Sequence, residues 1–171
     1  MKLRMTLLLF VGMMMSTTAF GQSTKDAWDD ILWDIELGVG TKYKGLQQAN
    51  LSLDLGYKIA DLFYPYVRTE RSLMLYKRDG VKTYGNTWNI GGGAGVIVYK
   101  GVDKHDKEPF TIEVTGNVTT SVGNYDYKNT SYYGGVRLRS DGVFLSLGYR
   151  YMSAHGHEFH NYSAFVISIG F

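Results

Sequence analysis

The segment 152–162 holds the densest group of side chains in this sequence that can do chemistry. Three of the four histidines lie in it, together with Ser153 and Glu158. Imidazole groups suit Zn, Cu or Ni, so four residues are weak candidates for a transition-metal site: His155, His157, Glu158 and His160. Ser153, a histidine and Glu158 are alternatively the parts of a Ser-His-acid hydrolase. A solvated polar loop explains the same residues and is favoured, so no catalytic residue, metal or cofactor is predicted.

A second set of charged residues alternates with apolar residues along most of the chain. The five acids are Asp34, Glu36, Asp54, Glu70 and Glu113, and the five bases are Lys58, Arg68, Arg137, Arg139 and Arg150. On the inside of a narrow barrel, which side chains just fill, such charges must pair with one another. We therefore predict a lumen charge network that satisfies itself. A narrow ion path gated by these ion pairs is the functional alternative.

The alternation that places these charges has a period of two residues, which is the signature of β-strands with one polar and one apolar face. Eight segments show it: 32–40, 51–59, 62–70, 86–99, 110–120, 132–139, 143–151 and 163–171. The third segment is the weakest because Pro65 lacks the backbone N–H that a central strand donates. No later stretch is long and apolar enough for a transmembrane helix. The pattern predicts an all-β domain of eight antiparallel strands.

The connections between these segments differ in length in a regular way. Residues 60–61 and 140–142 are predicted tight turns, and only 100–109 breaks the rule by being longer than a turn. The remaining connections are predicted to be long polar loops: 41–50, 71–85, 121–131 and 152–162. Short turns at one end and long loops at the other are typical of up-and-down barrels in outer membranes.

The aromatic residues of the apolar face support this arrangement. With the strands running alternately up and down, one group falls at the end with short turns: Trp33, Tyr57, Phe63, Phe110 and Phe171. Another group falls at the end with long loops: Trp88, Tyr132, Tyr149 and Tyr151. Two aromatic girdles mark the two interfaces of a membrane, whereas a soluble barrel or sandwich does not predict them. The sequence therefore predicts an eight-stranded antiparallel up-and-down transmembrane β-barrel.

The N-terminus has the pattern of a cleaved secretory signal. Lys2 and Arg4 precede an apolar run over residues 5–15, and the small residues Ala19 and Gly21 follow. The run is too short to span a bilayer, so residues 1–21 are predicted to be removed and residues 22–171 to form the barrel. That mature part has 16 basic and 16 acidic residues, because the signal contains two of the 18 bases and none of the 16 acids. This balance gives no indication of a nucleic-acid partner.

The final segment ends in Ser163-Ala164-Phe165-Val166-Ile167-Ser168-Ile169-Gly170-Phe171. With the signal and the eight alternating segments, it makes the chain resemble the small OmpA/OmpX-type barrels and the broader porin-like outer-membrane β-barrel family. The resemblance implies export to the outer membrane of a Gram-negative bacterium and assembly by the barrel-insertion machinery, which reads a terminal Phe. It also implies contact with outer-membrane lipids, including lipopolysaccharide.

The resemblance to this family leaves the activity open. A non-enzymatic structural or surface-binding role through the outer loops is favoured, with a narrow pore as one alternative. Outer-membrane lipid A deacylases are eight-stranded barrels too, so a lipid-modifying hydrolase is the other alternative. Their His-x-Ser signature is absent here, since Ser153 precedes His155, and no residue is transferred from them.

Overall fold

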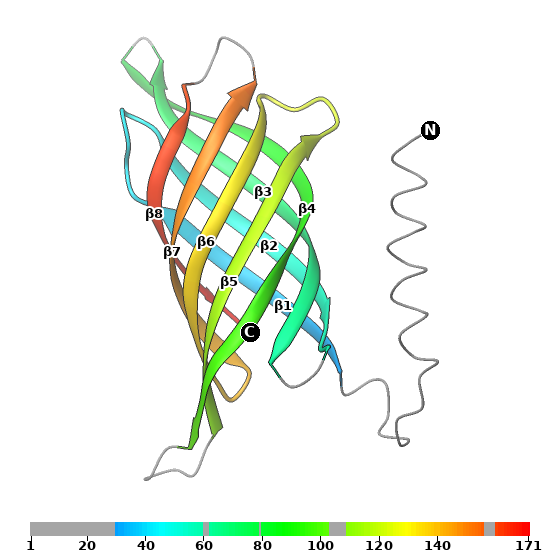
Figure 1. The fold of residues 1–171 in the computed structure, drawn as a ribbon. Helices are drawn as coiled ribbons and strands as arrows, with labels where there is room; N and C mark the ends of the chain where they lie inside the picture. Colours follow the sequence, from blue (N-terminus) through cyan, green and yellow to red (C-terminus); the bar gives the residue numbers. More distant parts are fainter. Residues whose placement is uncertain (1–29, 60–61, 79, 103–108, 156–159) are drawn as a thin grey trace, which may run out of the picture.

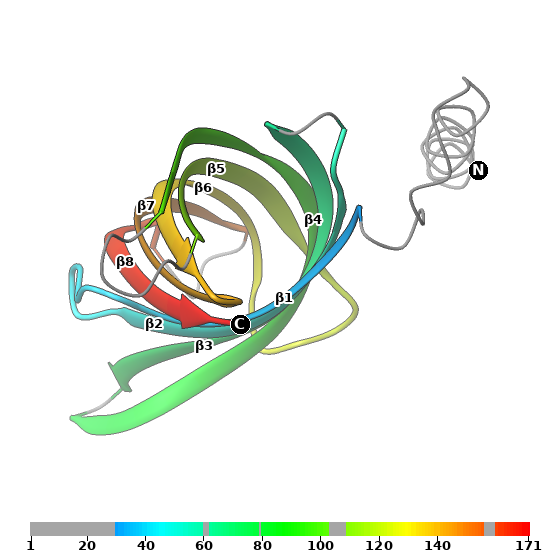
Figure 2. The same cartoon turned by 90° about the horizontal axis from the view of Figure 1, so that it is seen from below.

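The computed structural model describes residues 30–59, 62–78, 80–102, 109–155 and 160–171. They form eight antiparallel strands in up-and-down order, and β1 closes the barrel by pairing with both β2 and β8 (Figures 1 and 2). The strands are β1 Ile31–Gly40, β2 Gln47–Tyr57, β3 Phe63–Arg78, β4 Val81–Val102, β5 Pro109–Val122, β6 Lys128–Ser140, β7 Val143–His155 and β8 Tyr162–Gly170. The predicted all-β, eight-stranded antiparallel barrel is confirmed. No helix among the described residues is long and apolar enough to cross a membrane.

Consecutive connections lie at opposite ends of the barrel (Figure 1). We call the end with the β1–β2, β3–β4, β5–β6 and β7–β8 connections the loop end, and the opposite end the turn end. At the turn end, Asp141 and Gly142 form the predicted tight turn with φ of 47° and 77°, which suits a two-residue hairpin loop. The predicted signal peptide, residues 1–21, lies outside the described residues.

The prediction of a long loop over residues 71–85 is wrong. β3 and β4 stay paired through this segment up to Arg78 and Val81, and the hairpin turns at Gly80, whose φ is 82°. Polar residues obscured the alternation, but it continues: Leu73 and Leu75 are exposed while Met74 is fully buried. The other long connections are also shortened by strand extension. Of the connection 100–109, both edges belong to strands and the middle lies outside the described residues.

Each strand is displaced along its neighbour, so a row of paired residues runs obliquely around the wall. The row that begins at Trp88 on β4 passes through β3, β2, β1, β8, β7, β6 and β5 and returns to β4 at Tyr99. Such a stagger requires strands tilted against the barrel axis. A bulge between Ile97 and Tyr99 adds one residue to β4. It leaves Ile97 buried inside and both Val98 and Tyr99 exposed outside.

The polarity of the two faces of the barrel wall is the reverse of that in a water-soluble domain. Aliphatic side chains point outward, with Ile167 59% and Leu37 57% exposed, whereas Arg68 and Glu70 inside are 2% and 1% exposed. Aromatic residues flank the aliphatic band at both ends. Tyr149 packs on Phe165 toward the loop end, and Tyr99 packs on Phe110 toward the turn end. The core of this protein is therefore a polar lumen.

Candidate functional site

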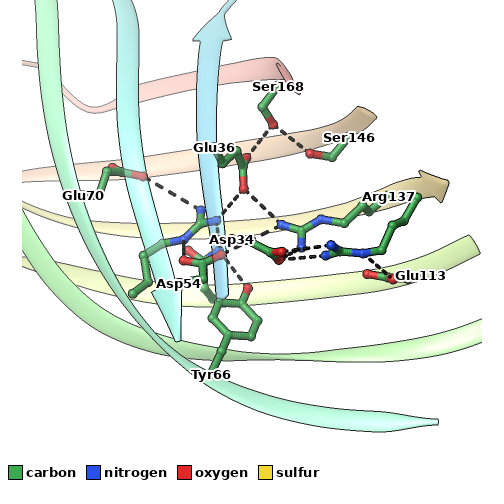
Figure 3. A network of polar contacts seen from close by, with 12 residues as sticks. Asp34, Glu36, Asp54, Tyr66, Glu70, Glu113, Arg137, Ser146 and Ser168 are labelled. Carbon is green, nitrogen blue, oxygen red and sulfur yellow. Dashed lines mark hydrogen bonds and ion pairs between the residues drawn. The ribbon is translucent and has the colours of Figure 1, made fainter. Parts of the chain in front are cut away.

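The lumen charge network is built from inward positions on six strands. β1 supplies Asp34 and Glu36, β2 supplies Asp54, β3 supplies Arg68 and Glu70, β5 supplies Glu113, β6 supplies Arg137 and Arg139, and β7 supplies Arg150. Period-two alternation brings all of them to the inside, and the stagger of the strands brings opposite charges to the same level (Figure 3).

Arg68 is the centre of the network. It donates to both oxygens of Asp54, from Nε at 2.6 Å and from Nη2 at 2.7 Å, and its Nη2 also donates to Glu36 Oε2 at 2.5 Å. Asp54 lies directly opposite Arg68 in the β2–β3 ladder, so the bidentate contact follows from the register. Bidentate arginine–carboxylate pairs are strong and directional. Arg68 therefore fixes two carboxylates from two different strands.

Arg137 and Arg139 share the carboxylate of Asp34. Arg137 Nη1 donates to Asp34 Oδ2 at 2.7 Å and Nη2 donates to Glu36 at 3.1 Å. Arg139 donates to both oxygens of Asp34, at 2.9 and 2.7 Å, and its Nε donates to an oxygen of Glu113 at 3.2 Å. The ring of Phe144 lies 3.8 Å and 4.9 Å from the two guanidinium carbons. Its π face attracts both cations.

Glu70 and Arg150 form the part of the network nearest the loop end. Both oxygens of Glu70 accept from Arg150, each at 2.8 Å, and Ser72 donates to Glu70 at 2.7 Å. Glu70 is 4.0 Å from Arg68, which joins this pair to the rest. One chain of alternating charge results, in the order Glu113, Arg139, Asp34, Arg137, Glu36, Arg68, Glu70 and Arg150.

The tenth predicted residue, Lys58, does not join the network. It follows β2 at the turn end, is half-buried, and forms no ion pair with any described carboxylate. Five carboxylates therefore face four arginines. Hydroxyl groups also donate to these carboxylates: Tyr64 donates to Glu113 and Ser168 donates to Glu36, each at 2.5 Å. Sequence reasoning missed these hydroxyls, although their inward positions in the alternation marked them.

Apolar and aromatic side chains close the lumen on both sides of the network. Toward the turn end, Tyr64, Tyr66 and Ile97 are buried together. Glycine makes room for the rings, since a Cβ at Gly93 would lie 2.6 Å from Tyr66 Cζ. Toward the loop end the buried cluster is larger and consists of Leu46, Met74, Tyr127, Met152, Tyr162 and Ala164. Buried apolar and aromatic side chains therefore flank the charged middle of the lumen on both sides, and Arg139 keeps 20% of its side chain exposed at the turn end.

The histidine-rich segment is only partly described. His155 ends β7, is exposed, and its Nε2 lies 3.3 Å from Thr130 Oγ1, and His160 is also exposed. His157 and Glu158 lie outside the described residues. Within the described part of the chain, no group of three or more histidine, cysteine or acidic residues is arranged to hold a metal ion.

Comparison with protein-family models, with curated proteins and with solved structures gave no match. The class that the geometry defines is a closed eight-stranded antiparallel β-barrel with a charged lumen and an apolar outer wall.

Proposed function

We propose that this protein is an integral outer-membrane β-barrel with a non-enzymatic, structural or surface-binding role. The observation that carries the proposal is the inverted distribution of polarity, in which arginine and glutamate are buried while leucine, isoleucine and valine cover the outside. A soluble monomer rarely exposes apolar patches beyond a few hundred Å². In a lipid bilayer the same apolar wall contacts acyl chains and is stable.

The dimensions of the wall support the same proposal. A tilted strand needs about 9–11 residues to cross the hydrocarbon core. β8, β1 and β2 have 9, 10 and 11 residues. β3, with 16 residues, and the part of β4 that pairs with it extend beyond that length as a hairpin at the loop end. β4, with 22 residues, also continues at the turn end, where Val102 pairs with Pro109 of β5. A hairpin that stands clear of the membrane is a surface on which another molecule can bind.

The loop end has a basic rim, which supports contact with anionic lipid headgroups such as those of lipopolysaccharide. Its exposed lysines are Lys42, Lys44, Lys77, Lys82 and Lys128. Asp126 is the one exposed acid among the described residues of this end. Each base near an anionic membrane surface adds about 1 kcal/mol of attraction.

The packing of the lumen argues against a narrow pore, because the charges pair with one another and buried apolar and aromatic clusters lie on both sides of them. The lipid-modifying hydrolase stays an alternative that depends on residues outside the described part of the chain. Export through residues 1–21 and recognition of Phe171 by the barrel-insertion machinery complete the proposal.

In the proposed orientation the loop end faces the outside of the cell and the turn end faces the periplasm. The accessibility of the two ends to a reagent tests this orientation. The chain has no cysteine, so Asn124→Cys at the loop end and Ser140→Cys at the turn end each introduce a single thiol at an exposed site. We expect a maleimide too large to cross the outer membrane to label the Asn124 variant on intact cells. The Ser140 variant should react only after the cells are broken. Labelling in the opposite pattern would reverse the orientation, and labelling of neither variant in membrane fractions would contradict the proposal.

A further inference from the structure

The outer wall contains a groove of about 690 Å³ that the lumen charge network does not explain. It crosses β7, β8, β1, β2 and β3 on the outward face. Its apolar lining includes Leu37, Val39, Ala49, Leu51, Ile167 and Ile169. Ala49 pairs with Val39 on one side and Leu73 on the other, so a small residue between two larger ones makes the wall concave there.

The groove ends at a basic residue. In the row of paired residues, Leu145 pairs with Ile169, Ile169 with Leu37, Leu37 with Leu51, and Leu51 with Arg71. Arg71 in turn pairs with Trp88 of the aromatic band near the loop end. The row descends from there toward the turn end, because it reaches Tyr99 on the far side of the barrel. An apolar path therefore leads from mid-wall up to one guanidinium group.

Arg71 has a positive charge that no described carboxylate neutralises. Its Nη2 donates to Asn86 Oδ1 at 2.6 Å, and its guanidinium carbon lies 5.9 Å and 5.0 Å from the rings of Trp88 and Tyr125. Asp126 accepts from the backbone and side chain of Asn86. Asn86 is thereby oriented with its oxygen toward Arg71, and the guanidinium keeps donors for an anion.

The length of the path suits one leaflet of a membrane. From β7 to β3 the row takes four strand-to-strand steps, which at about 4.8 Å each make roughly 19 Å. Strands tilted by about 40° leave a rise of roughly 12 Å along the membrane normal. Half of the hydrocarbon core is about 15 Å thick. An acyl chain in the groove would therefore stay within the leaflet whose headgroups lie at the height of Arg71.

We infer that Arg71 and this groove form a binding site for an anionic lipid of the leaflet at the loop end, with a lipid phosphate at Arg71 and one acyl chain along the groove. The inference rests on the proposed function, since it requires the wall to face lipid. A guanidinium binds phosphate through paired hydrogen bonds and is more weakly hydrated than an ammonium group, which favours this role at a membrane interface.

Quenching of Trp88 fluorescence measures this binding directly. The other two tryptophans, Trp28 and Trp33, are replaced by phenylalanine, and the barrel is reconstituted into phosphatidylcholine vesicles. A small fraction of chain-brominated phosphatidylglycerol or brominated phosphatidylcholine is included as the quencher. Attraction of one anionic headgroup to one base should enrich the phosphatidylglycerol about fivefold around Trp88. Quenching by the anionic lipid should exceed that by the zwitterionic lipid accordingly.

Three variants separate the site from a general charge effect. Arg71→Gln should remove the preference for the anionic lipid, whereas Lys77→Gln, which removes an equal charge from the same strand outside the groove, should retain it. Ala49→Phe fills the groove and should reduce the quenching without changing the charge. Heat-modifiable gel mobility verifies that each variant is folded.

A barrel with Trp33 as the only tryptophan distinguishes the two ways in which the experiment can fail. Trp33 is 60% exposed on the same wall at the turn end, so it should be quenched by both brominated lipids without preference. If Trp88 and Trp33 are both quenched equally by both lipids, the inference fails and the proposed function stands. If neither tryptophan is quenched by any brominated lipid, the wall does not face lipid and the proposed function fails as well. If the Arg71→Gln variant kept the same preference for the anionic lipid as the barrel with Arg71, the inference would also be overturned.

Discussion

Replacing Arg68 with methionine is expected to lower the free energy of unfolding by about 3–5 kcal/mol, the typical cost of removing one partner from a buried ion pair. Asp54 would lose both of its short contacts and Glu36 would lose one, in a part of the lumen where Arg68 is 2% exposed. The measurement is urea unfolding of the reconstituted barrel, followed by tryptophan fluorescence. Arg68→Lys should restore part of the loss, because it returns the charge without the bidentate geometry.

Arg139 provides a graded control for the Arg68 result. Its side chain is 20% exposed at the turn end, whereas that of Arg68 is 1% exposed. Water can therefore replace part of what Arg139 donates, and Arg139→Met should cost less than Arg68→Met. Equal and small losses for both variants would mean that the lumen is wet and that the charge network contributes little to stability.

Replacing Ile167 with arginine is expected to destabilise the barrel by about 2–4 kcal/mol, the usual cost of a basic residue on the lipid face near mid-membrane. Ile167 is 59% exposed on β8, so in water the same change would alter the free energy of unfolding by less than about 0.5 kcal/mol. The fraction of protein with heat-modifiable mobility in membrane preparations, together with urea unfolding in vesicles, measures the loss.

Val81 is the matched control for Ile167. It is also apolar and 67% exposed, but it lies at the tip of the β3–β4 hairpin, beyond the proposed membrane. Val81→Arg should therefore leave the stability of the barrel unchanged. If both arginine variants are harmless, the outer wall does not face lipid. If both are damaging, a contact of the hairpin that the proposal does not include is required.

The eight strands were predictable because one face of each is apolar and the other polar, a contrast that a barrel imposes on every strand. The ends of the strands were not. Residues 71–85 lack that contrast, and their pairing depends on backbone hydrogen bonds that continue past the apolar band. Arg71 lay in that segment, so both the residue and the groove beside it were missed.

The alternation predicted which charged side chains face the lumen, but it did not predict which of them pair with one another. Arg137 contacts Glu36 across about a hundred residues of sequence, and this contact depends on how far each strand is displaced along the next. No residue type encodes that displacement. Lys58 is excluded for a different reason, since β2 ends at Tyr57, one residue before it.

Refolding of residues 22–171 from urea tests the central proposal, that the apolar outside of this barrel faces lipid. Diluted into phospholipid vesicles, the chain should acquire a β-sheet circular dichroism spectrum and heat-modifiable mobility, and it should float with the vesicles in a density gradient. Diluted into lipid-free buffer, it should remain unfolded or precipitate, because the exposed leucines, isoleucines and valines have no apolar partner. A folded, soluble monomer in lipid-free buffer would contradict the account.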